Sequence, residues 1–422
     1  SGSGKMEFVQ SELESEKFVY KMEDFNADTS NFKLKGSDAA SLAFSTDNVN
    51  AHINFKERWG EFKSNGQGSF VDFPENQYIC YIDQFKWFMD QEDIQITAGT
   101  DAKSMEMGGS KFISVHPAQD SLQFVSPSAH FSLKDYTIAA EDVKKIDVAD
   151  AEIYPDGGDV MVLKHARMQP LESAKIMANR TTRYHNFYDA TIDITSRKSY
   201  KGKATYDYVD VAGQKRAIKF DPLTVDSAFQ SYGRGEVKEE ENFTLSPNFK
   251  YKGTVELYAS KPNLRYTGST RIVHNCEGIG SSWLKFDAEI DPKEIFIPIE
   301  KNPRDAAGKA VSTGIALQKD STRIYPTFLS PKINTGDIDI IAAEGYLFYD
   351  NITKEYRISN KEKLKGATVP GNFISLSENC IASGQGKLDL GLNLGQVQLT
   401  PAVSYTHLRA HETKANLVCR LL

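Results

Sequence analysis

The chain has 422 residues, of which 50 are Lys or Arg and 57 are Asp or Glu, so its formal net charge is −7. This mild acidity argues against a nucleic-acid surface, because such a surface carries a basic patch. No apolar run approaches the roughly 20 residues of a membrane-spanning helix, so we expect no transmembrane helix. With 24 Phe and 19 Tyr, the composition favours strands and a folded core over disorder.

Residues 1–110 are expected to form an N-terminal β region. The chain starts with SGSGKMEF, which contains neither an initiator Met nor a signal peptide, and we interpret the whole as an internal fragment of a larger protein. The most aromatic stretch is 85–89. Its Trp87 is either a ring exposed for stacking on sugars or part of a core strand, and we favour the core strand.

Short strands recur most densely within residues 121–178. Apolar and polar residues alternate there in units such as Ala151-Glu152-Ile153-Tyr154, which is the pattern of half-buried strands. Irregular repetition of this kind favours an elongated β-solenoid or a stacked open β-roll, with β-sandwich modules as the alternative. We therefore expect residues 111–185 to form a dense, solenoid-like region of short strands.

Four acids are close together in this region, namely Asp147, Asp150, Asp156 and Asp159. Glycoside hydrolysis requires two facing carboxylates, and the Gly-Gly turn between Asp156 and Asp159 offers a place for calcium. Acids in turns and on outward strand faces are also the ordinary surface of an acidic β protein, and we favour this interpretation. We therefore predict no catalytic, cofactor-binding or metal-binding residue from the sequence.

Residues 186–300 are predicted to continue the strands. Val255, Leu257 and Ala259 share one face, and a turn at 261–263 precedes the next strand. The cysteines Cys80, Cys276 and Cys380 are widely spaced, and only His274 stands beside one of them. We expect isolated core thiols, while one disulfide stays open as an alternative.

Residues 301–402 repeat the alternation in a C-terminal β region that we expect to be truncated. The stretch 343–360 reads as two strands around a turn at Asp350 and Asn351, and regularly spaced leucines predict another strand in 387–399.

The tail, residues 403–422, matches the translation of a transposase-based sequencing adapter. Residues 404–412 read SYTHLRAHE, a variable index follows, and residues 416–422 read NLVCRLL. We expect this tail to be non-native, the true chain to continue past Pro401, and the tail to be disordered or helical. His407, His411 and Glu412 would otherwise imitate half of a zinc site.

Two stretches resemble a known family. YKGTVELYASKPNLRYTGSTRI, from residue 251, and AEGYLFYDNITKEYRI, from residue 343, resemble the strand pattern of the OstA-like lipopolysaccharide-transport family. The resemblance implies an open β-jelly roll that shields lipid chains, and it carries over no residue with a specific role. PENQYICYIDQFKWFMD and GKLDLGLNLGQVQLT also resemble large exported proteins of Bacteroidota, which implies the periplasm or the cell envelope.

Two hypotheses for the function follow. The first is a non-enzymatic cell-envelope protein, structural or lipid-handling, without a cofactor and with lipid or other envelope proteins as partners. The second is a carbohydrate-binding or polysaccharide-degrading β protein. A lipid-handling roll needs an open apolar interior, a glycan site needs exposed rings beside paired carboxylates, and a structural roll is filled by its own side chains. We favour the first hypothesis.

Overall fold

The computed structural model describes residues 2–36, 41–66, 69–98, 108–321 and 323–389, together with the backbone of a strand at Ala402–Arg409. Strands make up 58% of the chain and helices 3%, which confirms the prediction of an all-β protein. Among the described residues, no helix has the length and apolar character needed to cross a membrane.

The chain forms two compact units. Unit 1 comprises Ser1–Tyr206, Lys219–Gly233 and Tyr258–Pro262, and unit 2 comprises Asp207–Ile218, Arg234–Leu257 and Asn263–Leu422. The expected division into regions 1–110, 111–185, 186–300 and 301–402 stays a prediction.

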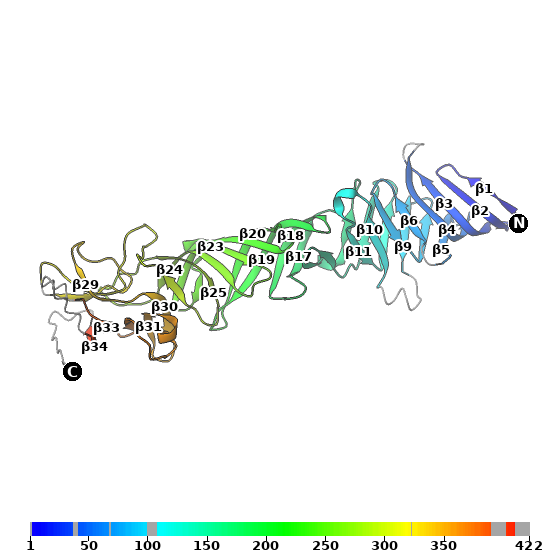
Figure 1. Ribbon diagram of the computed structural model, residues 1–422. Coiled ribbons are helices and arrows are strands. Elements are labelled where there is room, and N and C mark those ends of the chain that lie inside the picture. The colour runs from blue at the N-terminus through cyan, green and yellow to red at the C-terminus, as the bar shows by residue number, and fades with distance from the viewer. Residues whose placement is uncertain are drawn as a thin grey trace. The chain divides into compact units, whose positions relative to one another are not determined.

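The first sheet of unit 1 has fourteen strands, and β1 to β4 follow one another as neighbours in it (Figure 1). Its strands are β1 (Gly2–Glu7), β2 (Ser11–Tyr20), β3 (Asp24–Lys35), β4 (Leu42–Asn54), β5 (Trp59–Ser64), β6 (Phe70–Phe73), β7 (Tyr78–Tyr81), β8 (Gln84–Phe88), β9 (Asp93–Thr97), β10 (Ser110–Ser114), β11 (Gln123–Ser126), β12 (Ser128–Ser132), β13 (Thr137–Glu141) and β16 (Val160–Val162).

Strand β4 divides this sheet into two wings. Its first half pairs with β6 through Ser45 and Thr46, and its second half, residues 49–54, pairs with β5. From β6 the sheet continues through β7, β10 and β11, and from β5 through β8, β9, β12, β13 and β16. Because these pairs are antiparallel and belong to one continuous sheet, this part of the chain is an open β-roll, which is one of the two predicted forms, rather than a solenoid or separate sandwich sheets.

Aromatic side chains fill the space between the two wings. Phe44 on β4, Phe73 on β6 and Phe131 on β12 are fully buried. The Phe73 and Phe131 ring centroids, which come from opposite wings, lie only 4.9 Å apart, and Phe62 stacks on Phe85 at 4.5 Å. Each buried Phe contributes about 1.5–3 kcal/mol to stability. The interior of this roll is therefore filled by its own rings.

The remaining strands between residues 146 and 290 belong to an eleven-stranded sheet. They are β14 (Ile146–Val148), β15 (Ala151–Tyr154), β17 (Leu171–Ala178), β18 (His185–Ser196), β19 (Ser199–Val209), β20 (Lys215–Val225), β21 (Ser231–Val237), β22 (Thr244–Ser246), β23 (Phe249–Tyr258), β24 (Leu264–Ile272) and β25 (Leu284–Ile290). Of these, β14, β15, β17 and β18 belong to unit 1, β22, β24 and β25 belong to unit 2, and the others contribute residues to both. Short 3-10 turns occur at η1 (Pro117–Gln119), η2 (Asp156–Gly158) and η3 (Glu239–Glu241).

Unit 2 also contains two smaller sheets and one helical turn, α2 (Lys361–Leu364). Their strands are β26 (Ile297–Ile299), β27 (Gly314–Leu317), β28 (Ile324–Pro326), β29 (Ile338–Ala342), β30 (Gly345–Asp350), β31 (Glu355–Ser359), β32 (Phe373–Ser377), β33 (Ile381–Lys387) and β34 (Ala402–Arg409). The predicted turn at Asp350 and Asn351 joins β30 to β31. Most of the strand predicted in 387–399 lies outside the described residues.

The structure corrects our preference for isolated thiols. Cys276 and Cys380 form a disulfide with a Cα–Cα distance of 5.3 Å, although 104 residues separate them in the sequence. Cys80 is buried and is the only free cysteine among the described residues. Spacing alone hid the pair because the fold of unit 2, and not the local sequence, brings the two residues together.

The expectation of disorder or a helix in the tail is wrong for its first part. The backbone of Ala402–Arg409 forms β34 and pairs with β33. The N–H and C=O groups along a free sheet edge accept almost any extended segment, so pairing requires no selected sequence. The non-native origin of the tail stays a prediction, and residues 410–422 lie outside the described part of the chain.

Candidate functional site

Unit 1 contains a surface hollow of about 570 Å³, which we call the Asp150 cleft. Its walls come mainly from four segments: the β14–β15 turn, the residues after β17, the β18–β19 turn and the β20–β21 turn. Main-chain hydrogen bonds join three of these, from Ala149 N to Arg197 O and from Arg180 N to Asp150 O, both at 2.8 Å. The backbone therefore fixes the walls relative to one another.

The cleft brings together two of the four acids that the sequence singled out. Asp147 and Asp150 line it, whereas Asp156 and Asp159 are exposed in and beside η2, where a solvated turn was favoured. The Asp147 carboxylate lies 3.3 Å from Lys145 Nζ and 3.7 Å from Arg180 Nη1. Cations therefore compensate the charge of Asp147.

Two buried hydroxyl groups, one hydrogen-bonded to the other, hold the Asp150 carboxylate in place. Its Oδ1 accepts hydrogen bonds from Ser231 N at 3.0 Å and from Ser231 Oγ at 2.7 Å. The fully buried Tyr200 hydroxyl lies 2.5 Å from Ser231 Oγ. Burial raises the pKa of Tyr200, so the phenol stays protonated and its O–H donates a hydrogen bond to Ser231 Oγ.

The second oxygen of Asp150 is buried without a hydrogen-bond partner. Oδ2 is buried, and no hydrogen-bond donor from the described residues reaches it. A buried carboxylate oxygen without a donor is costly, because it has lost water and gained no replacement. The hydroxyl groups of Ser231 and Tyr200 thus fix the orientation of the Asp150 carboxylate.

The rest of the cleft carries cations and one aromatic ring. Arg197 and Lys198 contact Asp120 at 3.6 and 2.9 Å, and the hydrogen bond from Lys198 lowers the pKa of Asp120. Phe229 lies in the β20–β21 turn and is 54% exposed. Lys198 Nζ is 5.9 Å from the centroid of its ring. The cleft therefore offers donors, acceptors and an apolar surface together.

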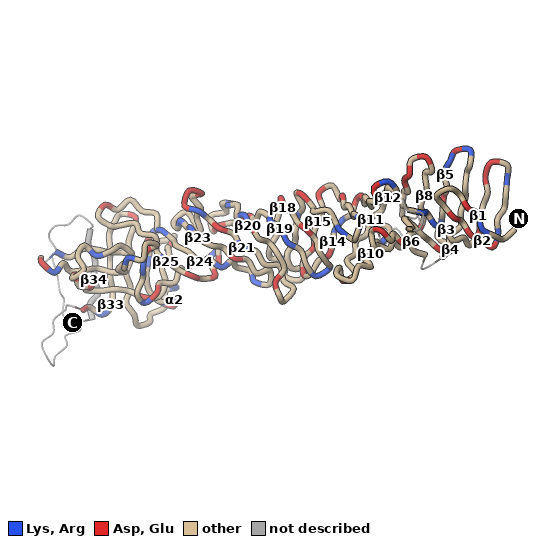
Figure 2. The backbone as a smooth tube through the Cα atoms, turned by 90° about the horizontal axis from the view of Figure 1, so that it is seen from above, with Lys and Arg blue, Asp and Glu red and all other residues tan. Residues whose placement is uncertain are grey.

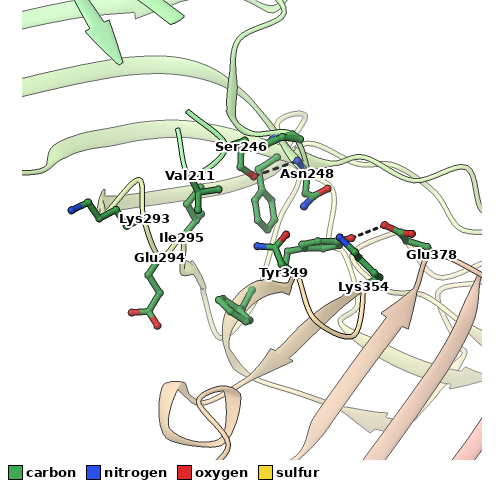
Figure 3. A pocket seen from close by; sticks show the side chains of 14 residues that line it. Val211, Ser246, Asn248, Lys293, Glu294, Ile295, Tyr349, Lys354 and Glu378 are labelled. Carbon is green, nitrogen blue, oxygen red and sulfur yellow. Dashed lines mark hydrogen bonds between the residues drawn. The ribbon is translucent and has the colours of Figure 1, made fainter. Parts of the chain in front are cut away.

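A second hollow, the Tyr349 cleft of about 620 Å³, lies within unit 2 (Figure 3). Val211 and Ile295 lie on one side in Figure 3, with Tyr349 and Lys354 across from them. The Tyr349 hydroxyl donates a hydrogen bond to Glu378 at 2.6 Å. Burial and this hydrogen bond raise the pKa of Tyr349, so it stays a donor to the carboxylate.

Tyr349, which lines the cleft, also packs against a second tyrosine. The rings of Tyr349 and Tyr356 meet edge to face at 4.9 Å, and the Tyr356 hydroxyl lies 2.9 Å from Asn248 O and 2.8 Å from Val273 O. Sequence reasoning missed this cleft, because its residues come from separate segments between 211 and 378 and share no motif.

The other residues considered from the sequence have structural positions. Trp87 is 6% exposed and its ring lies 5.3 Å from that of Phe32, so the core-strand interpretation is confirmed. His274 Nδ1 accepts a hydrogen bond from Cys276 N at 3.1 Å, and Cys276 is in the disulfide. Among the described residues, no three His, Cys, Asp or Glu side chains gather as a metal site would require. His411, Glu412 and the side chain of His407 lie outside the described part.

Comparison of the chain with protein-family models, with curated proteins and with solved structures finds no match. The OstA-like resemblance therefore stays a prediction.

Proposed function

We propose that this chain is a non-catalytic, structural protein of the cell envelope. The observation that carries the proposal is the filled interior of the open roll in unit 1. Rings from opposite wings, such as Phe73 and Phe131, are in contact at 4.9 Å. A lipid conduit needs an apolar interior in which acyl chains gain about 0.8 kcal/mol per buried CH₂. Here the chain's own side chains occupy that position, which supports a structural role over lipid handling.

The disulfide supports a location in the envelope. Disulfides persist in oxidising compartments such as the periplasm or the cell surface, and cytosolic reductants remove them. The Cys276–Cys380 pair belongs to unit 2, and Cys276 is only 6% exposed. The disulfide therefore supports the periplasm or the cell envelope as the proposed location.

The charged surface fits a solvated scaffold. Figure 2 shows Lys and Arg residues interspersed with Asp and Glu residues along the chain. Many of them form exposed ion pairs, such as Arg265 with Asp287 at 2.8 Å and Lys198 with Asp120 at 2.9 Å. Such pairs keep a protein soluble while adding little stability.

The lipid-handling alternative is tested by purifying the chain from membranes without denaturant and measuring bound lipid by mass spectrometry. We expect no stoichiometric lipid. One lipid per chain, lost when purification follows complete unfolding and refolding, would contradict the structural role. The location is tested separately, by cell fractionation and by thiol labelling of the chain before and after reduction. A free Cys276 and Cys380 in freshly lysed cells would contradict an oxidising compartment.

A further inference from the structure

We propose that unit 1 self-associates through the outer face of the wing formed by β6, β7, β10 and β11, which packs against the same face of a second copy of this chain. The contact places the Asp72 carboxylate of one copy beside the partner's Lys111. The inference does not depend on the structural role above, because it concerns the outer surface of the roll and not its interior.

The strands of this wing are apolar on both faces. Residues that point inward from them, such as Phe73 and Cys80, are fully buried. The outward residues alternate with the inward ones along each strand, and most are also apolar, namely Phe70, Ile79, Tyr81, Ile113 and Val125. A strand with one face in water alternates apolar with polar residues, whereas a strand covered on both faces is apolar throughout. The pattern of this wing is therefore that of a covered sheet.

The opposite wing, with β5, β8, β9 and β12, has a different outer face. Most of its outward residues are polar, namely Glu61, Lys63, Gln84, Lys86, Asp93, Gln95, Thr97, Ser128, His130 and Ser132. Its two outward rings lie under a cation, since Lys86 Nζ is 4.4 Å from the centroid of Trp59 and 5.3 Å from that of Phe88. The two outer faces of the roll therefore differ, and only one has the character of a contact surface.

The apolar residues of the β6 wing form a contiguous surface, which we call the outer patch: Phe70, Asp72, Ile79, Tyr81, Lys111, Ile113 and Val125. Tyr81 pairs in register with Phe70 on one side and with Lys111 on the other. Phe70 and Tyr81 are 42% and 41% exposed, and their ring centroids lie 6.2 Å apart. A contiguous exposed apolar surface marks an interaction site, whereas single exposed apolar residues are ordinary.

Two charged groups in the outer patch indicate what covers it. Asp72 on β6 and Lys111 on β10 form no ion pair with any described residue. Because β7 lies between their strands, the spacing of a sheet places them about 12 Å apart, too far to pair with each other. Burial raises the pKa of Asp72, because its carboxylate has lost water without gaining a cation. The patch thus contains one uncompensated anion and one uncompensated cation.

A second copy of the chain supplies both missing partners at once. In a two-fold symmetric contact, an ion pair between Asp72 and the partner's Lys111 is repeated by symmetry with the roles exchanged. A purely basic or purely acidic protein surface would compensate only one of the two charges. The apolar interior of a lipid bilayer would compensate neither, and an unpaired charge in such a medium is costly. Self-complementarity therefore favours a second copy over these partners.

The size of the outer patch sets the expected affinity. Its strands are four or five residues long. Four such strands, about 4.8 Å apart, cover roughly 300 Å². Stable interfaces bury about 800 Å² on each partner. We therefore expect a weak dimer that dissociates on dilution in the micromolar range.

The test is sedimentation of the full chain over a range of micromolar concentrations, where the parent should show a monomer–dimer equilibrium. Asp72→Lys and Lys111→Asp should each weaken the dimer about tenfold, because like charges then face each other. Mixing the two variants should restore association, because each altered charge then meets its opposite on the other chain. The double variant, with the two charges exchanged, should also associate as the parent does.

The matched controls are Asp135→Lys and Lys134→Asp, which make the same changes at exposed positions in the β12–β13 turn of the opposite wing. Both should associate as the parent does. Melting curves show whether each variant is folded, and Tyr81→Ala, which also should weaken the dimer, replaces any charge variant that unfolds. The proposal is overturned if the parent stays monomeric, if the patch variants associate as the parent does, or if neither the mixture nor the double variant restores association. A monomer that binds phosphatidylcholine vesicles through Tyr81 would overturn it in favour of a lipid surface.

Discussion

Replacing Phe44 by Ala tests whether the aromatic interior holds the roll of unit 1 together. Phe44 is fully buried, and its ring lies 5.0 Å from Phe85, 5.5 Å from Phe73 and 6.3 Å from Phe131. A buried Phe→Ala substitution costs about 3–5 kcal/mol, and the loss is larger where neighbours cannot collapse into the cavity. The neighbouring rings are held by both wings of the sheet, so we expect about 4 kcal/mol.

The assay is urea unfolding followed by Trp fluorescence in a Trp283→Phe background. The chain has three Trp residues, so this background leaves only Trp59 and Trp87, both in unit 1, and their signal follows that unit. Phe70→Ala, which removes a 42% exposed ring, should cost less than about 1 kcal/mol. If Phe44→Ala came within about 1 kcal/mol of the parent, the interior would not be close-packed and the argument against a lipid conduit would fail.

Three further predictions concern ionisation and the disulfide. Burial lowers the pKa of His185, so the folded state prefers the neutral ring, and unit 1 should lose stability as pH falls below the unfolded value of 6.5. Urea unfolding at pH 7 and pH 5 should show this loss, and the loss should be smaller in His185→Gln. The hydrogen bond from Lys145 lowers the pKa of Glu152 to about 2. Glu152 should therefore add about 2 kcal/mol to the free energy of unfolding above pH 4.5, a value reduced because solvent screens the exposed Lys145, and this stability should be lost as pH falls toward 2. An unchanged pH profile in Glu152→Gln would refute it. Reducing the Cys276–Cys380 disulfide should lower the stability of unit 2 by up to about 4–5 kcal/mol and leave unit 1 unchanged. Unit 1 is followed in the Trp283→Phe background, and unit 2 by the additional signal of the parent chain; an equal loss in unit 1 would count against this.

The sequence by itself determined the strands and the face that each one buries. Val255, Leu257 and Ala259 alternate with polar residues, and all three are fully buried in the structure. A strand turns successive side chains to opposite faces, so a period of two in the sequence identifies the buried face without knowledge of the neighbouring strands. The turn at 261–263 could be read for the same reason, because its Pro and Asn interrupt the alternation locally.

Tertiary structure alone decided what each buried face packs against and which distant residues meet. No local pattern could show that the division of β4 would bring Phe73 and Phe131 into contact. Likewise, Asp150 and Phe229 stand 79 positions apart, and only the curl and register of the sheet place them in one cleft. Local sequence sets the side of a strand on which a residue lies, whereas pairing order and sheet curvature arise from interactions along the whole chain.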